Sequence, residues 1–327
     1  MNNLLKLCAL IIIGGLAFPP YGQLSAQAGN LNSTDNSGAQ NAAQAGDAQN
    51  GSAHQTSHAN CLPAVHIPEP AASVGFDRLT FCDDFDSLST IDVSGTGAPG
   101  YNWYSKLPFG PNRTLPSAYN ISDSVLTITS KGYTANWGLT TRDPVTGNGH
   151  AFNFGYFEAR IKFDPSLAPN SKGWPSFWSL DAYHTEYNDD TTWAELDFFE
   201  AYNGGHATYT GEYLGTLHQE FPHKPGYENV PGDWYVPNPA VNWNSWNIIG
   251  CLWQQGQVTW YLNGKAVINQ TYSADAFPKP PPAPSHNLPT PSYAGAYKVL
   301  DSDLMQLILG SSPGWPLQVD YVRVWQK

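Results

Sequence analysis

Short runs of alternating apolar and polar residues dominate the chain after about residue 60. A period of two places the apolar side chains on one face of a β-strand, and no long segment shows the 3.6-residue period of an amphipathic helix. The pattern predicts strands over these segments: Leu79–Phe85, Val125–Ser130, Phe154–Phe163, Ala194–Ala201, Trp246–Trp253, Gln257–Leu262 and Leu317–Trp325. Many strands without helices favour an all-β jelly-roll sandwich of two curved antiparallel sheets.

Turn and loop signals separate these strands. The Asn263-Gly264 pair lies between Trp260–Leu262 and Ala266–Ile268 and predicts a two-residue hairpin, because both residues tolerate a positive φ. The Pro-rich segments Lys224–Ala240 and Phe277–Pro291 cannot join a central ladder, since proline has no N–H to donate. We therefore expect surface loops at both segments.

The first 60 residues follow a different pattern. An apolar run, Leu7–Phe18, precedes the small-residue site Ala26-Gln27-Ala28, which predicts a secretory signal peptide over residues 1–28. The run is too short to span a bilayer, which argues against the alternative of an uncleaved anchor. Residues 29–60 are rich in small and polar residues and contain no Phe, Trp or Tyr, so we expect a disordered linker. Residues 61–327 then form one exported domain that is free of the membrane after cleavage.

Charge and cysteine content restrict the possible partners. Acidic residues outnumber basic ones by 27 to 15 and Lys and Arg form no cluster, so we expect no binding to nucleic acid. Loss of Cys8 with the signal peptide leaves Cys61, Cys82 and Cys251, which permits one disulfide and a free thiol, and all three pairings stay open. The 12 Trp and 18 Tyr offer flat faces for stacking on sugar rings, although a sandwich core also uses aromatic residues.

Three carboxylates, Glu195, Asp197 and Glu200, lie within six residues of otherwise apolar sequence. On a regular strand Glu195 and Asp197 share one face, whereas Glu200 falls on the opposite, apolar face. A β-bulge at Phe198-Phe199 would return Glu200 to the face of the other two. Crowded like charges push pKa values apart, so one Glu can carry a proton while the other stays ionised. The strand therefore predicts acid–base chemistry, and an acidic surface without chemistry is the alternative.

The pattern Glu195-Leu-Asp197-Phe-Phe-Glu200 resembles the Glu-x-Asp-x-x-Glu signature of glycoside hydrolase family 16. This family includes laminarinases, mixed-linkage β-glucanases, agarases, carrageenases and transglycosylases. The similarity extends to segments on both sides of the motif: Leu79–Phe85, Asn153–Phe163, Gly173–Trp178, Trp260–Lys265 and Val319–Trp325. The resemblance implies that residues 61–327 are a catalytic jelly roll with a concave substrate groove.

The resemblance implies roles for single residues. Glu195 is expected to be the nucleophile, Asp197 its assistant and Glu200 the general acid/base. Four side chains are expected to contact sugar: Trp174, Trp178, Trp193 and His218. Trp178 and Trp193 could instead pack within the sandwich, and His218 could have a structural role. We expect no cofactor to be required for the chemistry. Many relatives carry a structural calcium ion. Asp84 and Asp320 match the positions of its site, and carboxylate oxygens suit that ion.

We therefore expect a secreted, monomeric, retaining endo-glycoside hydrolase that acts on β-1,3- or mixed β-1,3/1,4-glucan. Retention requires two carboxyl groups about 5–5.5 Å apart, whereas five strand steps span roughly 16 Å between α-carbons. Laminarinases usually have Ile-Met at Phe198-Phe199, and the insertion Asp181–Thr192 would lie beside the groove. Hydrolysis of another plant or algal polysaccharide, or transglycosylation, thus stays open, although scarce Lys and Arg argue against sulfated galactans. The three intact carboxylates argue against a non-catalytic carbohydrate-binding protein.

Overall fold

The computed structural model describes eleven stretches of the chain: 61, 65–108, 114, 116–129, 137–167, 175–182, 193–201, 213–220, 241–271, 304–311 and 314–327. The expected signal peptide (1–28) and linker (29–60) lie outside the described residues. So do Trp174, most of the insertion, and the predicted loops at 224–240 and 277–291. Within the described part of the chain, no helix combines the length and hydrophobicity needed to cross a membrane.

Most described residues form the strands of two sheets. Sheet A contains, in spatial order, β13 (Lys265–Thr271), β12 (Gln257–Leu262), β11 (Asn247–Gln254), β7 (Gly155–Lys162), β15 (Leu317–Gln326), β5 (Val125–Ile128) and β4 (Tyr119–Ser122), and β1 (Arg78–Asp83) also pairs with β15. Sheet B contains β10 (Leu214–Glu220), β9 (Trp193–Glu200), β8 (Ser176–Asp181), β14 (Met305–Ser311), β6 (Trp137–Thr140), β3 (Trp103–Tyr104) and β2 (Ile91–Asp92). Neighbouring strands are antiparallel, except for the parallel pair of β2 and β3.

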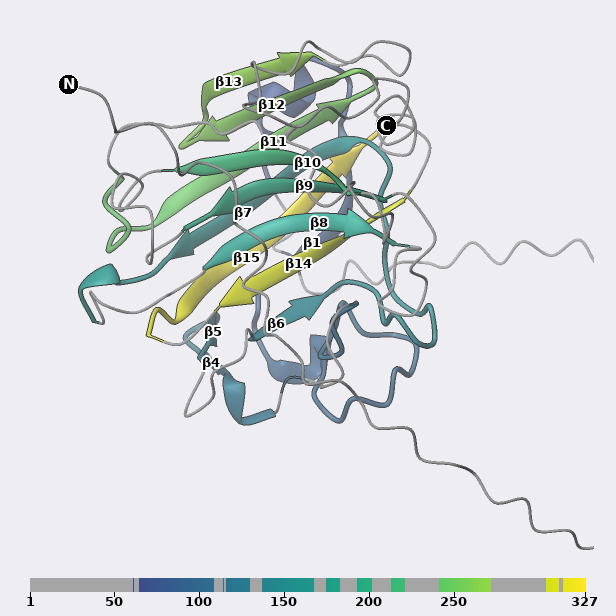
Figure 1. The fold of residues 1–327 in the computed structure, drawn as a ribbon, viewed down its shortest axis with the longest axis vertical. Coiled ribbons are helices and arrows are strands. Elements are labelled where there is room, and N and C mark those ends of the chain that lie inside the picture. The colour runs from purple at the N-terminus through teal and green to yellow at the C-terminus, as the bar shows by residue number, and fades with distance from the viewer. Residues whose placement is uncertain are drawn as a thin grey trace, which may run out of the picture. The chain divides into compact units, whose positions relative to one another are not determined.

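Helical structure in the described residues is confined to single turns. The four turns are α1 (Glu69–Ala72), η2 (Leu88–Thr90), η3 (Pro116–Ala118) and η4 (Pro165–Leu167). In Figure 1, β8, β9 and β14 of sheet B run across the front and β7 and β15 of sheet A run behind them. The prediction of an all-β sandwich built from two largely antiparallel sheets is therefore confirmed.

The main core lies between the two sheets and follows the predicted alternation. Alternate side chains of sheet A, such as Phe157 and Val322, belong to the same buried cluster as Phe177 and Leu196 of sheet B. Aromatic rings dominate this cluster, and Phe157 stacks on Phe198 across the sandwich with ring centroids 5.0 Å apart. The strands thus bury an apolar face between the sheets, as a period of two requires, and central strands such as β7 also bury residues on the other face.

The predicted hairpin joins β12 to β13. Asn263 and Gly264 have φ angles of 51° and 75°, which is the left-handed geometry that a two-residue turn requires. The Asn263 side chain also accepts a hydrogen bond from the Ile248 N–H at 2.8 Å and so ties the turn to β11. The hairpin prediction is confirmed.

An N-terminal segment covers part of the outward face of sheet A. Ala71 and Phe76 pack with Tyr156, Leu252 and Trp325 in a buried cluster that is separate from the main core. A disulfide between Cys61 and Cys82 links the beginning of this segment to β1, with a Cα–Cα distance of 6.2 Å. Cys251 is the buried free thiol, and burial raises its pKa. One of the three pairings that the sequence left open is thereby selected.

Candidate active site

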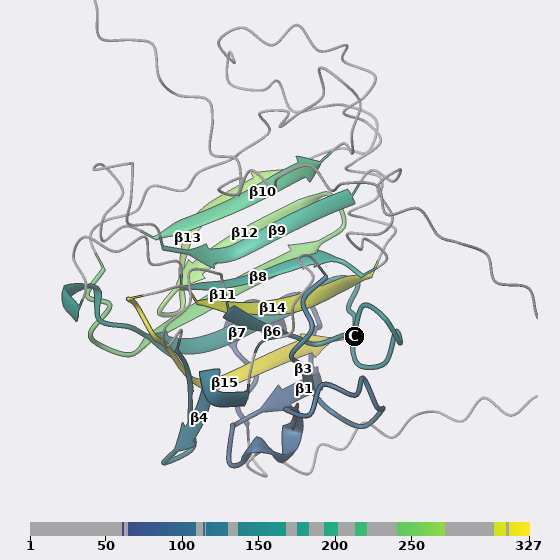
Figure 2. The ribbon, with the colours of Figure 1, turned by 60° about the horizontal axis from the view of Figure 1, so that its bottom comes forward.

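The three carboxylates of β9 lie in alternate cross-strand rows of sheet B. Strand β9 lies between β8 and β10, as Figure 2 shows. Across β8, β9 and β10 the rows are Leu180–Glu195–His218, Trp178–Asp197–Thr216 and Ser176–Glu200–Leu214. Because residues directly opposite each other in a ladder point to the same face, each row places its carboxylate on one shared face.

A β-bulge brings Glu200 onto this face. Strand β9 advances by three residues between Asp197 and Glu200. Strand β10 advances by only two residues between their partners, Leu214 and Thr216. The ladder with β8 shifts at the same point, so that one residue of β9 has no ladder position of its own. Phe198 and Phe199 are both fully buried in the main core, which is possible for consecutive residues only where alternation is broken. The predicted bulge at Phe198-Phe199 is confirmed.

The carboxylates differ in burial. Asp197 is fully buried and Glu200 is 5 % exposed, whereas Glu195 keeps an intermediate exposure. Leu196 and Phe198 point into the main core, so the carboxylates lie on the opposite side of the strand. Burying charge is costly, and such concentrations of buried acidic groups are typical of sites that use proton transfer.

An apolar patch adjoins the carboxylate rows. Leu107, Leu180 and Ile308 form a small buried cluster on the same side of sheet B, and the half-buried Trp178 packs against it. Trp178 therefore lies outside the main core and directly opposite Asp197 in the ladder. Leu107 and Ile308 were not predicted as site residues, because their sequence context is indistinguishable from that of ordinary core residues.

The other predicted sugar contacts are placed only in part. His218 lies opposite Glu195 in the ladder between β9 and β10. Trp193 is the first residue of β9 and lies opposite Glu220. Trp174 lies outside the described residues. The backbone register therefore brings one of these three positions, His218, beside a carboxylate.

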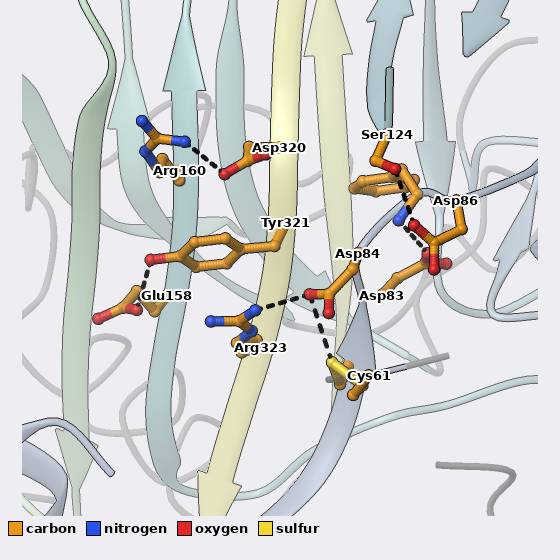
Figure 3. Close-up of polar contacts among 12 residues, drawn as sticks. Cys61, Asp83, Asp84, Asp86, Ser124, Glu158, Arg160, Asp320, Tyr321 and Arg323 are labelled. Atoms are coloured by element: carbon orange, nitrogen blue, oxygen red, sulfur yellow. Dashed lines mark hydrogen bonds and ion pairs between the residues drawn. A yellow bond between two sulfur atoms is a disulfide. The ribbon is translucent and has the colours of Figure 1, made fainter. Parts of the chain in front are cut away.

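The predicted calcium ligands each contact an arginine, as Figure 3 shows. Asp84 accepts a hydrogen bond from Arg323 at 2.8 Å, and Asp320 accepts one from Arg160 at 2.6 Å. In the described residues, the group of potential ligand atoms that lies close enough for one ion combines Asp84 with the two cysteines of the disulfide. Disulfide sulfurs are not thiolate ligands. The described residues therefore do not fit a calcium ion shared by Asp84 and Asp320.

Comparisons with known proteins show which family this chain is similar to. The family model described as glycosyl hydrolases family 16 matches residues 117–290, which include all three carboxylates. A curated relative, glucan endo-1,3-beta-glucosidase A1 of Niallia circulans, is 27 % identical over 186 residues, which is 51 % of this chain and 24 % of that protein. The chain therefore matches about a quarter of the length of that relative.

Several solved structures share the fold. A laminarinase from Flavobacterium sp. UMI-01 aligns with a TM-score of 0.52 at 16 % identity, covering 76 % of this chain and 100 % of that chain. LamA from Z. galactanivorans, crystallised in complex with laminaritriose and laminaritetraose, aligns with a TM-score of 0.50 at 16 % identity, covering 77 % and 100 %. Identities this low support the common sandwich fold and no more.

Proposed function

Because this chain belongs to family 16 of the glycosyl hydrolases, we propose that it is a secreted, retaining endo-hydrolase of β-1,3- or mixed β-1,3/1,4-glucan. The observation that carries this proposal is the set of three carboxylates of β9 in alternate cross-strand rows, which depends on the bulge at Phe198-Phe199. Without the bulge, Glu200 would point into the core, and only Glu195 and Asp197 would face the substrate.

Two glutamates suffice for a double displacement. The Glu195 carboxylate attacks the anomeric carbon while Glu200 donates a proton to the departing glycosidic oxygen, which leaves a glycosyl ester on Glu195. Glu200 then removes a proton from water as the water attacks the same carbon, and the ester bond breaks to regenerate the Glu195 carboxylate. Asp197 lies between the two rows and is proposed to orient the nucleophile.

The row spacing supports this assignment. From Glu195 to Glu200 the partner strand β8 advances four residues, from Leu180 to Ser176, or about 13 Å between α-carbons. The bulge therefore removes one strand step from the separation that a regular strand would give. A retaining reaction requires the two glutamate side chains to lean toward each other over Asp197 until the carboxyl groups are about 5–5.5 Å apart.

The proposed substrate rests on relatives and on the apolar patch. One relative is named a glucan endo-1,3-beta-glucosidase, and a structural neighbour was crystallised with laminari-oligosaccharides. The half-buried indole of Trp178 next to Asp197 supports stacking against a sugar ring. Trp174, Trp193 and His218 are proposed as further sugar contacts.

Export of the protein is supported by its disulfide. Disulfides form and persist in oxidising compartments, so the bond between Cys61 and Cys82 agrees with the signal peptide proposed for residues 1–28. We further propose that the enzyme acts as a monomer, binds polysaccharide and does not bind nucleic acid, given its net charge of −12.

Release of reducing sugar tests the proposed function. The full chain is incubated with laminarin, lichenan, barley β-glucan, xyloglucan, agarose and carrageenan, and Glu200→Gln is the matched control. Release from laminarin or lichenan that is lost in the variant supports the proposal. Release from xyloglucan, agarose or carrageenan alone would contradict the substrate, and binding without release or transfer from any polymer would favour a carbohydrate-binding protein.

A further inference from the structure

The bulge in β9 leaves Phe198 without a register partner in either ladder and interrupts the regular pairing next to Asp197. Buried carbonyl groups that lose a ladder partner require another donor, because an unsatisfied buried acceptor costs about 1–3 kcal/mol. Two consecutive carbonyls at the bulge receive such a donor from a side chain. The Trp260 indole donates to the Asp197 carbonyl at 2.8 Å, and the Tyr213 hydroxyl donates to the Phe198 carbonyl at 2.6 Å.

Trp260 reaches this carbonyl from the opposite sheet. It lies on β12 of sheet A and is fully buried, whereas Asp197 lies on β9 of sheet B. The indole also passes close to Gly215 of β10, where a Cβ atom would lie only 2.4 Å from the ring. Glycine is therefore required at position 215 for the close approach of the indole to sheet B.

Tyr213 comes from the residue directly before β10 and is also fully buried. Its ring stacks on Phe199, with centroids 6.1 Å apart and an interplanar angle of 20°. Burial raises the pKa of the Tyr213 hydroxyl well above its ordinary value, and the nearby Cys251 acts in the same direction. The hydroxyl thus stays protonated and keeps its hydrogen bond over the range in which a hydrolase works.

We propose that Tyr213 and Trp260 form a bulge clamp that positions Glu200 relative to Glu195. The proposal rests on the proposed function of the carboxylate face. The clamped carbonyls belong to Asp197 and Phe198, which lie between the two glutamates, so their orientation sets the direction of the following residues. A return of β9 to regular alternation would turn Glu200 toward the core. Tyr213 and Trp260 are thus positioning residues, which act through the backbone and do not touch the substrate.

Two conservative variants test the clamp. Tyr213→Phe removes only the hydroxyl, and Trp260→Phe removes the indole N–H while keeping an aromatic ring. We expect each variant to lower kcat on the cleaved glucan by about 10- to 100-fold, because small misplacements of catalytic groups have effects of this size. We expect KM to change by less than about twofold, since the sugar contacts are unaltered.

Matched controls separate positioning from stability. Tyr119 donates to the Gly138 carbonyl at 3.2 Å, and the Trp103 indole donates to Asp83 at 3.1 Å, both away from β9. Tyr119→Phe and Trp103→Phe therefore lose equivalent buried hydrogen bonds. We expect them to lower Tm as much as the clamp variants do, but to leave kcat within about twofold of the parent.

Hydrogen exchange gives a readout that does not depend on activity. Backbone amides of the peptide covering residues 193–201 should exchange about tenfold faster in the clamp variants than in the controls, because the bulge opens more often. If the parent cleaves no polysaccharide, the proposed function fails, and faster exchange still supports the clamp. Unchanged exchange in both clamp variants, or folded variants with the kcat of the parent, would overturn the clamp.

Discussion

The carboxylates on the outward face of sheet A and those on the site face of sheet B have different neighbours. On sheet A each carboxylate contacts a cationic or phenolic side chain, in the pairs Asp84–Arg323, Asp320–Arg160 and Glu158–Tyr321 (Figure 3). On sheet B the positions opposite the carboxylates in the described ladders are Leu180, His218, Trp178, Thr216, Ser176 and Leu214. On the outward face of sheet A the carboxylates thus lie on separate elements, each with its own partner. On the site face of sheet B all three carboxylates lie on one strand, β9.

The two faces therefore use carboxylate side chains for different purposes, stability on sheet A and chemistry on sheet B. The ion pairs of Asp84 and Asp320 contribute to stability because an arginine compensates each carboxylate, whereas placing three carboxylates on one strand carries an energetic cost. Enzymes commonly keep such costly arrangements at the residues that carry out the reaction. Substitutions of the three carboxylates of β9 should therefore change activity with little effect on folding, and substitutions in the ion pairs of Asp84 and Asp320 should do the reverse.

The largest expected effect is that of Glu195→Gln on the site face. The amide keeps the shape of the side chain but cannot act as a nucleophile, so we expect kcat to fall by about 10⁴-fold or more. Tm should stay level, because the amide keeps the shape of the side chain. The checks are initial rates on the cleaved glucan and a thermal melt, and a variant with ordinary turnover would contradict the role of Glu195.

Removal of the disulfide should have the largest effect on stability. The bond closes a loop with a sequence separation of 21, and the loss of such a cross-link costs about 3 kcal/mol in the free energy of unfolding. We expect Cys61→Ser to lower the urea midpoint without changing kcat. The reduced parent is the matched control, and its urea midpoint should equal that of the variant. Equal urea midpoints for Cys61→Ser and the oxidised parent would refute the prediction.

The Arg323 pair should contribute more than the Arg160 pair. The side chains of Arg323 and Asp84 are 15 % and 13 % exposed, so Arg323→Met leaves a largely buried carboxylate without its cation and should cost about 2 kcal/mol. Arg160 and Asp320 are 35 % and 29 % exposed, and Arg160→Met should cost less than about 1 kcal/mol. Urea unfolding measures both costs. Equal losses of unfolding free energy in the two variants would show that burial does not determine how much each ion pair contributes to stability.

The smallest effect is expected from Glu158→Gln, and it depends on pH. Burial raises the pKa of Glu158 in the folded protein, although hydrogen bonds from Tyr321 and Tyr156 and the charge of Arg323 oppose the rise. A raised folded-state pKa means that the stability contribution is present below the ordinary value of 4.5 and is lost as pH rises through the folded value. Glutamine does not ionise at all.

The Tm of the Glu158→Gln variant should therefore rise relative to that of the parent as the pH increases from acidic to neutral. Thermal melts of both proteins across this range check the sign of the trend. A gap that narrows or reverses toward neutral pH would show that pairing with Tyr321 and Arg323 outweighs burial.

Much of the site face could be predicted from local sequence. Period-two alternation gives the strand, and the conflict between that alternation and Glu200 requires a bulge. The argument needs only the neighbouring residues, because a charged group cannot easily face the core. For this reason Glu195, Asp197 and Glu200 were found together, and Phe198-Phe199 was identified as the place where alternation breaks.

The partners of these local features could not be predicted in the same way. Trp260 bonds to a carbonyl 63 residues away, and its own sequence context indicates only a core aromatic residue. Arg323 and Asp84 are 239 residues apart, so no short pattern in the sequence indicates that an arginine contacts this aspartate. Contacts between sheets depend on how the sandwich packs, and a single sequence does not contain that information in any short pattern.

Covalent trapping tests most directly whether Glu195 is the nucleophile of a retaining glucanase. The parent is incubated with an activated 2-deoxy-2-fluoro glycoside of a β-1,3-glucan oligosaccharide, and the digested protein is analysed by mass spectrometry. We predict one added glycosyl group, located on the peptide that contains Glu195 and absent from Glu195→Gln. A label on another residue, or inverted product without any label, would contradict the proposed mechanism.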